Sequence, residues 1–200
     1  MTLSDGTSQL IFHSLNVAPY EEQISDNFVL DFEDALRVFH TTKQWIEEAQ
    51  RYYTLEEHAS DYAHIVQDHS ALYQVLIFFE EDPKRLGAVS AFHCNVENST
   101  LMLLFSLSIR QCRMHKRRLD MLEKLQSSLN AQCYLSVCRQ LWFELGEISW
   151  EMLHIKLSAA KDLNSDSHSP DPHTLNKLNA LTSKSISYFG LFLDSLVNQG

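Results

Sequence analysis

The stretch YLSVCRQLWFELGEISWEMLHIKLSAA, residues 134–160, carries the strongest periodic signal in the chain. Apolar or small residues recur in it at alternating steps of four and three, at Tyr134, Cys138, Leu141, Leu145, Ile148, Met152, Ile155 and Ala159. Because an α-helix has about 3.6 residues per turn, positions with this spacing lie on one face. The stretch therefore predicts a helix of about seven turns that buries one apolar stripe.

Four further segments show helical spacing, at about 31–53, 62–82, 112–125 and 175–196. Asp31 is a suitable N-cap for the first, and Pro83 should end the second, because proline cannot continue a helix. Polar loops at 56–61 and 164–172 separate neighbouring segments. The chain has only five glycines and four prolines, and it shows no alternating strand pattern outside residues 86–111. The predicted fold is all-α, with helices that pair as successive hairpins.

These segments also specify which face should turn to the core: Phe32, Leu36, Phe39, Ile46, Ala49 and Tyr53 in the first, and Ile65, Leu72, Leu76 and Phe79 in the second. In 112–125 the expected core positions are His115, Leu119, Leu122 and Leu125. In the last segment they are Leu175, Leu178, Thr182, Ile186, Phe189, Leu193 and Leu196. Within the longest helix, Trp142-x-x-Leu145-Gly146 matches the opening of a tetratricopeptide repeat, in which the small residue allows close approach of the partner helix. No 34-residue repeat accompanies this match.

The charge distribution narrows the class of partner. The net charge is −10, which disfavours general binding to nucleic acid or anionic membranes and favours partners with a basic face. Residues 31–82 hold twelve acidic side chains against three basic ones, whereas residues 110–126 hold six basic against two acidic. An acidic half of the chain is therefore followed by a short basic patch.

The basic run RMHKRR, residues 113–118, has three interpretations. It could bind nucleic acid or act as a nuclear address, but it lacks interleaved aromatic residues and lies in an acidic protein. A contact with a protein partner is a second interpretation. A solvated helix face, balanced by nearby acids, is the interpretation favoured by composition.

Residue patterns typical of catalytic or metal sites are weak. His64 and Asp68 lie one helical turn apart, but a metal would need a third ligand that the sequence does not nominate. The four cysteines lack metal-site spacing, and no nucleophile–base pattern or phosphate loop is apparent. The most apolar run, LMLLFSLSI at 101–109, is too short to span a bilayer, and residues 1–17 lack a basic signal region. We expect no cofactor, no metal, no membrane insertion and a cytoplasmic location.

Several segments together resemble the KIF-binding, or kinesin-binding, protein family. They are DFEDALRVFHTTKQWIEEAQRYY (31–53), HIVQDHSALYQVLIFFEED (64–82), CRMHKRRLDMLEKL (112–125), the run 134–155 and ISYFGLFLDSL (186–196). The resemblance implies tetratricopeptide-like helical hairpins forming part of an α-solenoid, without catalytic activity. It also implies binding to kinesin motor domains, control of their engagement with microtubules, a link to axonal microtubule organisation and axon outgrowth, and association with the cytoskeleton.

The resemblance also divides the chain. Residues 1–30 are a weakly ordered lead-in, and 31–198 form the helical region, family-like at 31–85 and 112–198. Residues 86–111 have no counterpart, and we expect them to form a loop outside the hairpin or an extra helix. The family's N-terminal repeats and final helices are also missing, so the chain is expected to be a truncated or aberrant isoform.

The residues expected to contact a partner are acidic or polar and lie at the start of the second helix. They are Glu56, Glu57, Asp61, His64 and Asp68. The physical reason is electrostatic, since kinesins hold acidic tubulin through a basic surface for which an acidic superhelix could compete. Two alternatives stay open: that these acids only keep the protein soluble, and that the chain is a generic helical scaffold without kinesin binding.

Overall fold

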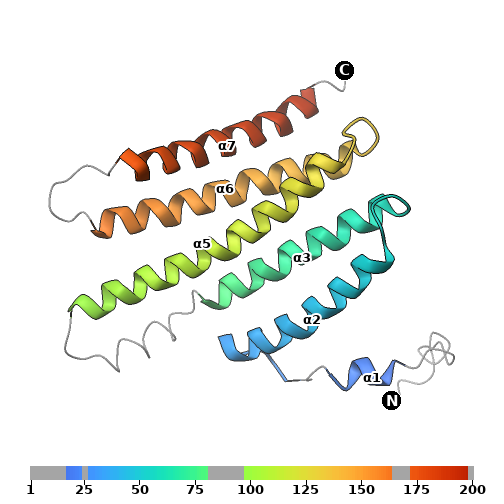
Figure 1. The fold of residues 1–200 in the computed structure, drawn as a ribbon, viewed down its shortest axis with the longest axis horizontal. Helices are drawn as coiled ribbons and strands as arrows, with labels where there is room; N and C mark the ends of the chain where they lie inside the picture. The colour runs from blue at the N-terminus through green and yellow to red at the C-terminus, as the bar shows by residue number, and fades with distance from the viewer. Residues whose placement is uncertain (1–16, 24–26, 81–96, 164–171, 198–200) are drawn as a thin grey trace, which may run out of the picture. The chain divides into compact units, whose positions relative to one another are not determined.

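The computed structural model describes residues 17–23, 27–80, 97–163 and 172–197, and within 97–163 it describes side-chain surroundings for 107–160. The chain divides into two compact units, Met1–Leu30 and Asp31–Gly200. The first unit contains the short helix α1 (Ala18–Glu21), which has proline in its first turn and buries no residue. The second unit contains all the longer helices (Figure 1).

Five helices follow one another in the second unit. They are α2 (Phe32–Tyr52), α3 (Ala59–Glu80), α5 (Glu97–Ser128), α6 (Leu135–Leu163) and α7 (Pro172–Val197). Each packs against the next along the chain and runs in the opposite direction (Figure 1). Asp31 caps α2 as predicted, since its Oδ1 accepts a hydrogen bond from the backbone N–H of Asp34 at 2.8 Å. The all-α prediction is confirmed for the described residues.

Side-chain bonds also join helices that are not consecutive. Ser70 on α3 donates a hydrogen bond to Glu144 on α6, and Lys184 on α7 donates one to Glu123 on α5. Alternate helices are therefore close enough to bond directly, which places α3 and α6 in one layer and α5 and α7 in another. This two-layer stacking of helical hairpins is the arrangement of a tetratricopeptide-like α-solenoid.

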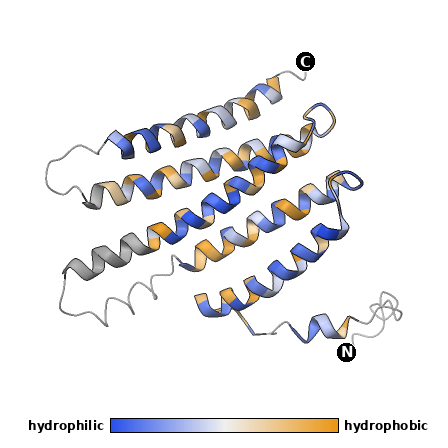
Figure 2. Ribbon diagram, in the orientation of Figure 1, coloured by the Kyte–Doolittle hydropathy of each residue, from blue (hydrophilic) through white to orange (hydrophobic). Residues whose placement is uncertain are grey.

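The core lies mainly between α5 and α6. Leu122, Leu141, Leu145 and Ile148 are completely buried. Every expected core position of the segment 112–125 is buried, and so are those of α6 from Cys138 to Met152. In Figure 2, hydrophobic bands alternate with hydrophilic ones along α6, while α5 is mainly hydrophilic after its first described turns. These two predicted stripes are confirmed, whereas of the positions predicted in α2 and α3 only Phe39 and Leu76 are buried.

The predicted core face of α7 is wrong. Its buried residues are Leu178, Leu181 and Ser185, and of these only Leu178 belonged to the predicted stripe. Ile186 and Leu193 are 67% and 57% exposed. Helix α7 is apolar on two faces, and it packs on α6 through one of them. Spacing within a single helix cannot indicate which of two such faces has a neighbour.

The segment without a family counterpart is partly described. Residues 97–111 belong to the same continuous helix as 112–128, so in this part α5 is neither a loop nor a separate helix. Residues 86–96 and Pro83 lie outside the described ranges. Across the helices that the structure describes, no window is both long and apolar enough to cross a bilayer.

Gly146 permits the closest approach between α6 and α7. A Cβ atom placed on Gly146 would lie 2.9 Å from ring atoms of Phe189, and Ser185 donates a hydrogen bond to the Gly146 carbonyl at 3.0 Å. Carbon atoms normally pack at about 3.5–4.0 Å, so the ring and an added methyl group cannot both keep these positions. The small residue in the W-x-x-L-G match therefore has the packing role that the sequence predicted.

We predict that Gly146→Ala lowers the free energy of unfolding by about 1–3 kcal/mol, because the Phe189 ring or the α7 backbone must move to fit the methyl group. The matched control is Gly190→Ala, since an added Cβ there meets nothing within 4 Å. The control should be neutral or up to about 1 kcal/mol more stable, from helix propensity. Urea unfolding followed by circular dichroism measures both. Equal stability of Gly146→Ala and the native chain would contradict the close packing.

Candidate functional site

The predicted contact residues all lie at the loop end of the α2–α3 hairpin or on the following turns of α3. Glu56 and Glu57 are in the loop, and Asp61, His64 and Asp68 are on α3. All five are exposed. Steps of three and four place Asp61, His64 and Asp68 on one face of α3, and Glu56 and Glu57 lie in the loop before it. Because α3 contains no lysine or arginine, this face carries negative charge without an opposing base on the same helix.

Three aromatic rings lie at the same end of the hairpin, and the sequence analysis did not single them out. Tyr52 ends α2, and Tyr53 and His58 belong to the loop. The ring centroids of Tyr52 and Tyr53 are 5.0 Å apart, those of Tyr53 and His58 5.4 Å, and those of Tyr52 and His58 6.3 Å. The adjacent tyrosines were a visible signal, but their relation to His58 depends on how the loop turns.

The basic run on α5 is not a uniform solvated face, and the prediction needs correction. Arg113, Lys116 and Arg117 are exposed, as expected. His115 and Arg118 are buried. Residues 115 and 118 lie one turn apart on the side of α5 that faces α3 and α6, so one of the four arginine and lysine residues of the run, together with its histidine, belongs to the interior.

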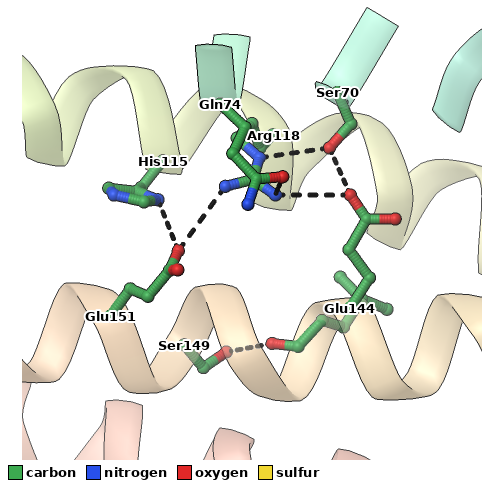
Figure 3. Close-up of polar contacts among 8 residues, drawn as sticks. Ser70, Gln74, His115, Arg118, Glu144, Ser149 and Glu151 are labelled. Carbon is green, nitrogen blue, oxygen red and sulfur yellow. Dashed lines mark hydrogen bonds and ion pairs between the residues drawn. The ribbon is translucent and has the colours of Figure 1, made fainter. Parts of the chain in front are cut away.

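Arg118 bonds to both neighbouring helices (Figure 3). Its Nε donates to Ser70 Oγ at 3.2 Å, and its Nη2 donates to Gln74 Oε1 at 3.1 Å, both on α3. Toward α6, Nη2 lies 3.4 Å from Glu144 Oε1 and Nη1 lies 3.5 Å from Glu151 Oε2. Ser70 in turn donates to Glu144 at 2.6 Å. The side chain of Arg118 is 3% exposed, so its charge is compensated almost entirely by these groups.

His115 lies beside the same acid but is not ionised with it. Its Nδ1 is 3.3 Å from Glu151 Oε2, yet the pair lacks hydrogen-bond geometry and Nδ1 has no other partner. Burial lowers the pKa of His115 to about 4, and the neighbouring charge of Arg118 acts in the same direction. His115 is therefore neutral at physiological pH, and the short distance to Glu151 is not a salt bridge there.

Two further polar contacts hold the ends of the array. Glu80, buried at the end of α3, accepts a hydrogen bond from Arg110 of α5 at 3.1 Å. Near the other end of α5, Glu123 accepts hydrogen bonds from Lys184 at 2.6 Å and from the Tyr188 hydroxyl at 2.8 Å, both on α7. Burial and the bond to Glu123 raise the pKa of Tyr188, so its hydroxyl stays protonated and donates.

These groups join three helices. Arg118 pairs with Glu144 and Glu151, and the Ser70 hydroxyl accepts a hydrogen bond from Arg118 and donates one to the Glu144 carboxylate. Within the described ranges, no group of three histidine, cysteine or acidic side chains could hold a metal ion. The exposed acids and the three aromatic rings lie at the loop end of the α2–α3 hairpin.

The sequence matches a known protein family. A sequence model described as "KIF-1 binding protein C terminal" matches residues 2–90 and 106–200. The chain belongs to this family. Apart from residue 1, the match leaves residues 91–105 unmatched, so residues 86–90 and 106–111 of the predicted insert, including Arg110, have a counterpart in the family. It also extends over residues 2–30, beyond the segments on which the resemblance was first based.

Curated relatives carry the name KIF-binding protein. The zebrafish protein (Danio rerio) is 39% identical over 180 residues, and the human protein is 35% identical over 180 residues, each alignment covering 90% of this chain. The Drosophila melanogaster protein is 28% identical over 184 residues, or 92% of the chain. The alignments cover only about a quarter of the relatives' length, 24–26%. No solved structure matches the chain.

We predict that Arg118→Met lowers the free energy of unfolding by about 1–2 kcal/mol, because it leaves the partly exposed carboxylates of Glu144 and Glu151 without their shared cation and solvent screens part of that loss. Lys116→Met is the matched control, since the Lys116–Asp120 pair is more than half exposed and should contribute at most about 0.5 kcal/mol. Chemical unfolding of both variants measures the difference. A loss of stability no larger than that of the control would show that Arg118 is dispensable for the fold.

Stability should also fall in mild acid through His115. Its pKa is about 4 when folded, against the ordinary value of 6.5, so the unfolded chain binds the proton more readily. The stability gained by holding His115 neutral in the folded chain is fully present above about pH 6.5 and is lost as the pH falls toward about 4. Burial lowers the pKa of His69 too, so that residue acts in the same sense.

The variant His115→Gln should therefore show a smaller decline in unfolding free energy over this pH range than the native chain. His64→Gln, which changes an exposed histidine, should keep the native decline. Urea titrations at a series of pH values provide the comparison. Parallel curves for His115→Gln and the native chain would exclude His115 as a source of the pH dependence.

Proposed function

We propose that this chain is a non-enzymatic adaptor segment that binds kinesin motor domains and thereby controls their engagement with microtubules. The match to the KIF-1 binding protein C-terminal family over most of the chain is the observation that carries this proposal. By extension from the relatives, the setting is the cytoplasm and cytoskeleton, with a role in axonal microtubule organisation and axon outgrowth. Since the relatives are about four times longer, other parts of such a protein would share in binding.

The acidic end of the α2–α3 hairpin is the part of this chain that we assign to the partner. Its five predicted residues are exposed, and three of them lie on one face of α3 after the loop that holds the other two. A basic protein surface approaching this end of the hairpin meets negative charge and no opposing base on α3. Such complementarity mainly speeds association and selects among partners, and it weakens as salt is added.

The buried network supports this surface from behind. Ser70 and Gln74, which bond to Arg118, lie on α3 just beyond Asp68. The same helix therefore presents acids outward in its first half and is bonded to α5 and α6 from the middle of its length. A surface on a rigid element loses less conformational entropy on binding than one on a loop.

A generic helical scaffold without kinesin binding is the alternative. Under it, the acids only increase solubility, and the exposed apolar side chains of α7 such as Ile186 and Leu193 serve other contacts. Binding of nucleic acid by the basic run is less favoured. Arg118 is buried and bonded to its own chain, so only three arginine and lysine side chains of the run are exposed.

The test is a charge reversal, compared with a control variant that has the same net charge. The double variant Glu56→Lys, Glu57→Lys should weaken binding of a kinesin motor domain at least about tenfold at low salt, since close charge pairs across interfaces are worth about 1.5 kcal/mol or more. The control Glu33→Lys, Asp194→Lys makes the same charge change at exposed sites on α2 and α7. Isothermal titration at two salt concentrations measures both. Equal affinities of the two double variants would remove the assigned surface, and no binding by the native chain would favour the scaffold.

A further inference from the structure

The aromatic cluster at the loop end of the α2–α3 hairpin has the geometry of a binding site. The rings of Tyr52 and His58 are nearly parallel, with an interplanar angle of 9°. Tyr53 stands almost perpendicular to both, at 79° to Tyr52 and 74° to His58. Two parallel rings with a third ring across them form three sides of an aromatic cage.

The cage is open to solvent and adjoins negative charge. Tyr52 is 72% exposed, and the rings of Tyr53 and His58 are partly buried behind it. Glu56 and Glu57 are exposed residues of the same loop, and Asp61 follows on the first turn of α3. Aromatic faces attract cations through their quadrupole, and neighbouring carboxylates add direct Coulomb attraction.

No cation of the described part of the chain occupies these rings. Arg117 lies over a ring, but that ring belongs to Tyr73, 5.8 Å from the guanidinium carbon. Arg51 adjoins Tyr52 in sequence, and its side chain is exposed. The chain itself therefore leaves the faces of Tyr52 and His58 available to a cation from outside.

The parallel rings favour a planar cation. Their centroids are 6.3 Å apart, which is the largest possible separation of the two ring planes, whereas a flat group in van der Waals contact with both rings needs roughly 7 Å. The Tyr52 ring, which is 72% exposed at the end of α2, therefore has to turn away from His58 to admit such a group. A guanidinium is planar and weakly hydrated, whereas an ammonium is compact and strongly hydrated.

We propose that Tyr52, Tyr53 and His58 form a binding site for an arginine side chain of a protein partner, with Glu56 and Glu57 supplying the opposing charge. The inference deepens the proposed function, because it names the kind of side chain that the acidic end of the hairpin receives. Only the identity of the partner as a kinesin rests on the proposed function.

The test uses capped arginine, Nα-acetyl-arginine methylamide, titrated into the full chain while the aromatic proton signals are followed by NMR. Capped citrulline, which has a similar shape without the charge, and capped lysine are the comparison probes. We expect saturable shifts confined to Tyr52, Tyr53 and His58, tightest with arginine and absent with citrulline. Tyr52→Leu should weaken arginine binding about fivefold. Phe78→Leu, which alters an exposed aromatic residue at the other end of α3, should leave it unchanged.

Three results would overturn the site: equal shifts with citrulline, lysine binding as tight as arginine, or no effect of Tyr52→Leu. The probe experiment contains no motor domain, so its outcome is independent of the kinesin proposal. If arginine binds as expected while the native chain fails to bind a motor domain, the cage stands and only the identity of the partner is wrong.

Discussion

The guanidinium of Arg118 is the constraint on which the middle of the molecule depends. Because the Arg118 side chain is only 3% exposed, its charge has to be compensated by neighbouring groups, and these come from two other helices. Ser70 and Gln74 fix α3 against α5, and Glu144 and Glu151 fix α6 against the same residue. Apolar packing between these helices is non-directional and would allow them to slide or rotate, whereas a planar group with fixed donor directions allows one register. The leucines of α5 and α6 supply most of the burial, and Arg118 determines how the helices are aligned.

This alignment has consequences for the outer surface. On the first half of α3, Ala63 and Val66 pack in the core, while the acids on the other face are exposed. The protein thus has charge in two settings: one basic side chain is buried between helices, and several acidic ones are exposed at the end of the hairpin. His115 is neutral because burial and the neighbouring charge of Arg118 both lower its pKa.

The sequence predicted the fold well where a helix is covered on its apolar side and poorly where it is not. Helix α6 and the second half of α5 have neighbours on both sides, and their spacing identified the buried residues from Leu119 to Met152. Helix α7 carries two apolar faces, and only contact with α6 selects the one with Leu178 and Leu181. The burial of Arg118 was not predictable in this way, because its partners lie 26–48 residues away along the chain. The five acidic and polar residues were chosen from charge and loop position, and their contact with a partner stays a prediction, whereas the ring cluster depends on a loop conformation that composition does not encode.

The central claim, that Arg118 joins α3, α5 and α6 into one cooperative unit, is tested most directly by amide hydrogen exchange on the native chain and Arg118→Met. The account predicts that the variant loses protection in the middle of all three helices together, near residues 70, 118 and 148, while the contact of α7 with α6 around Gly146 and Ser185 changes least. Loss of protection confined to α5, with α3 and α6 unchanged, would contradict it.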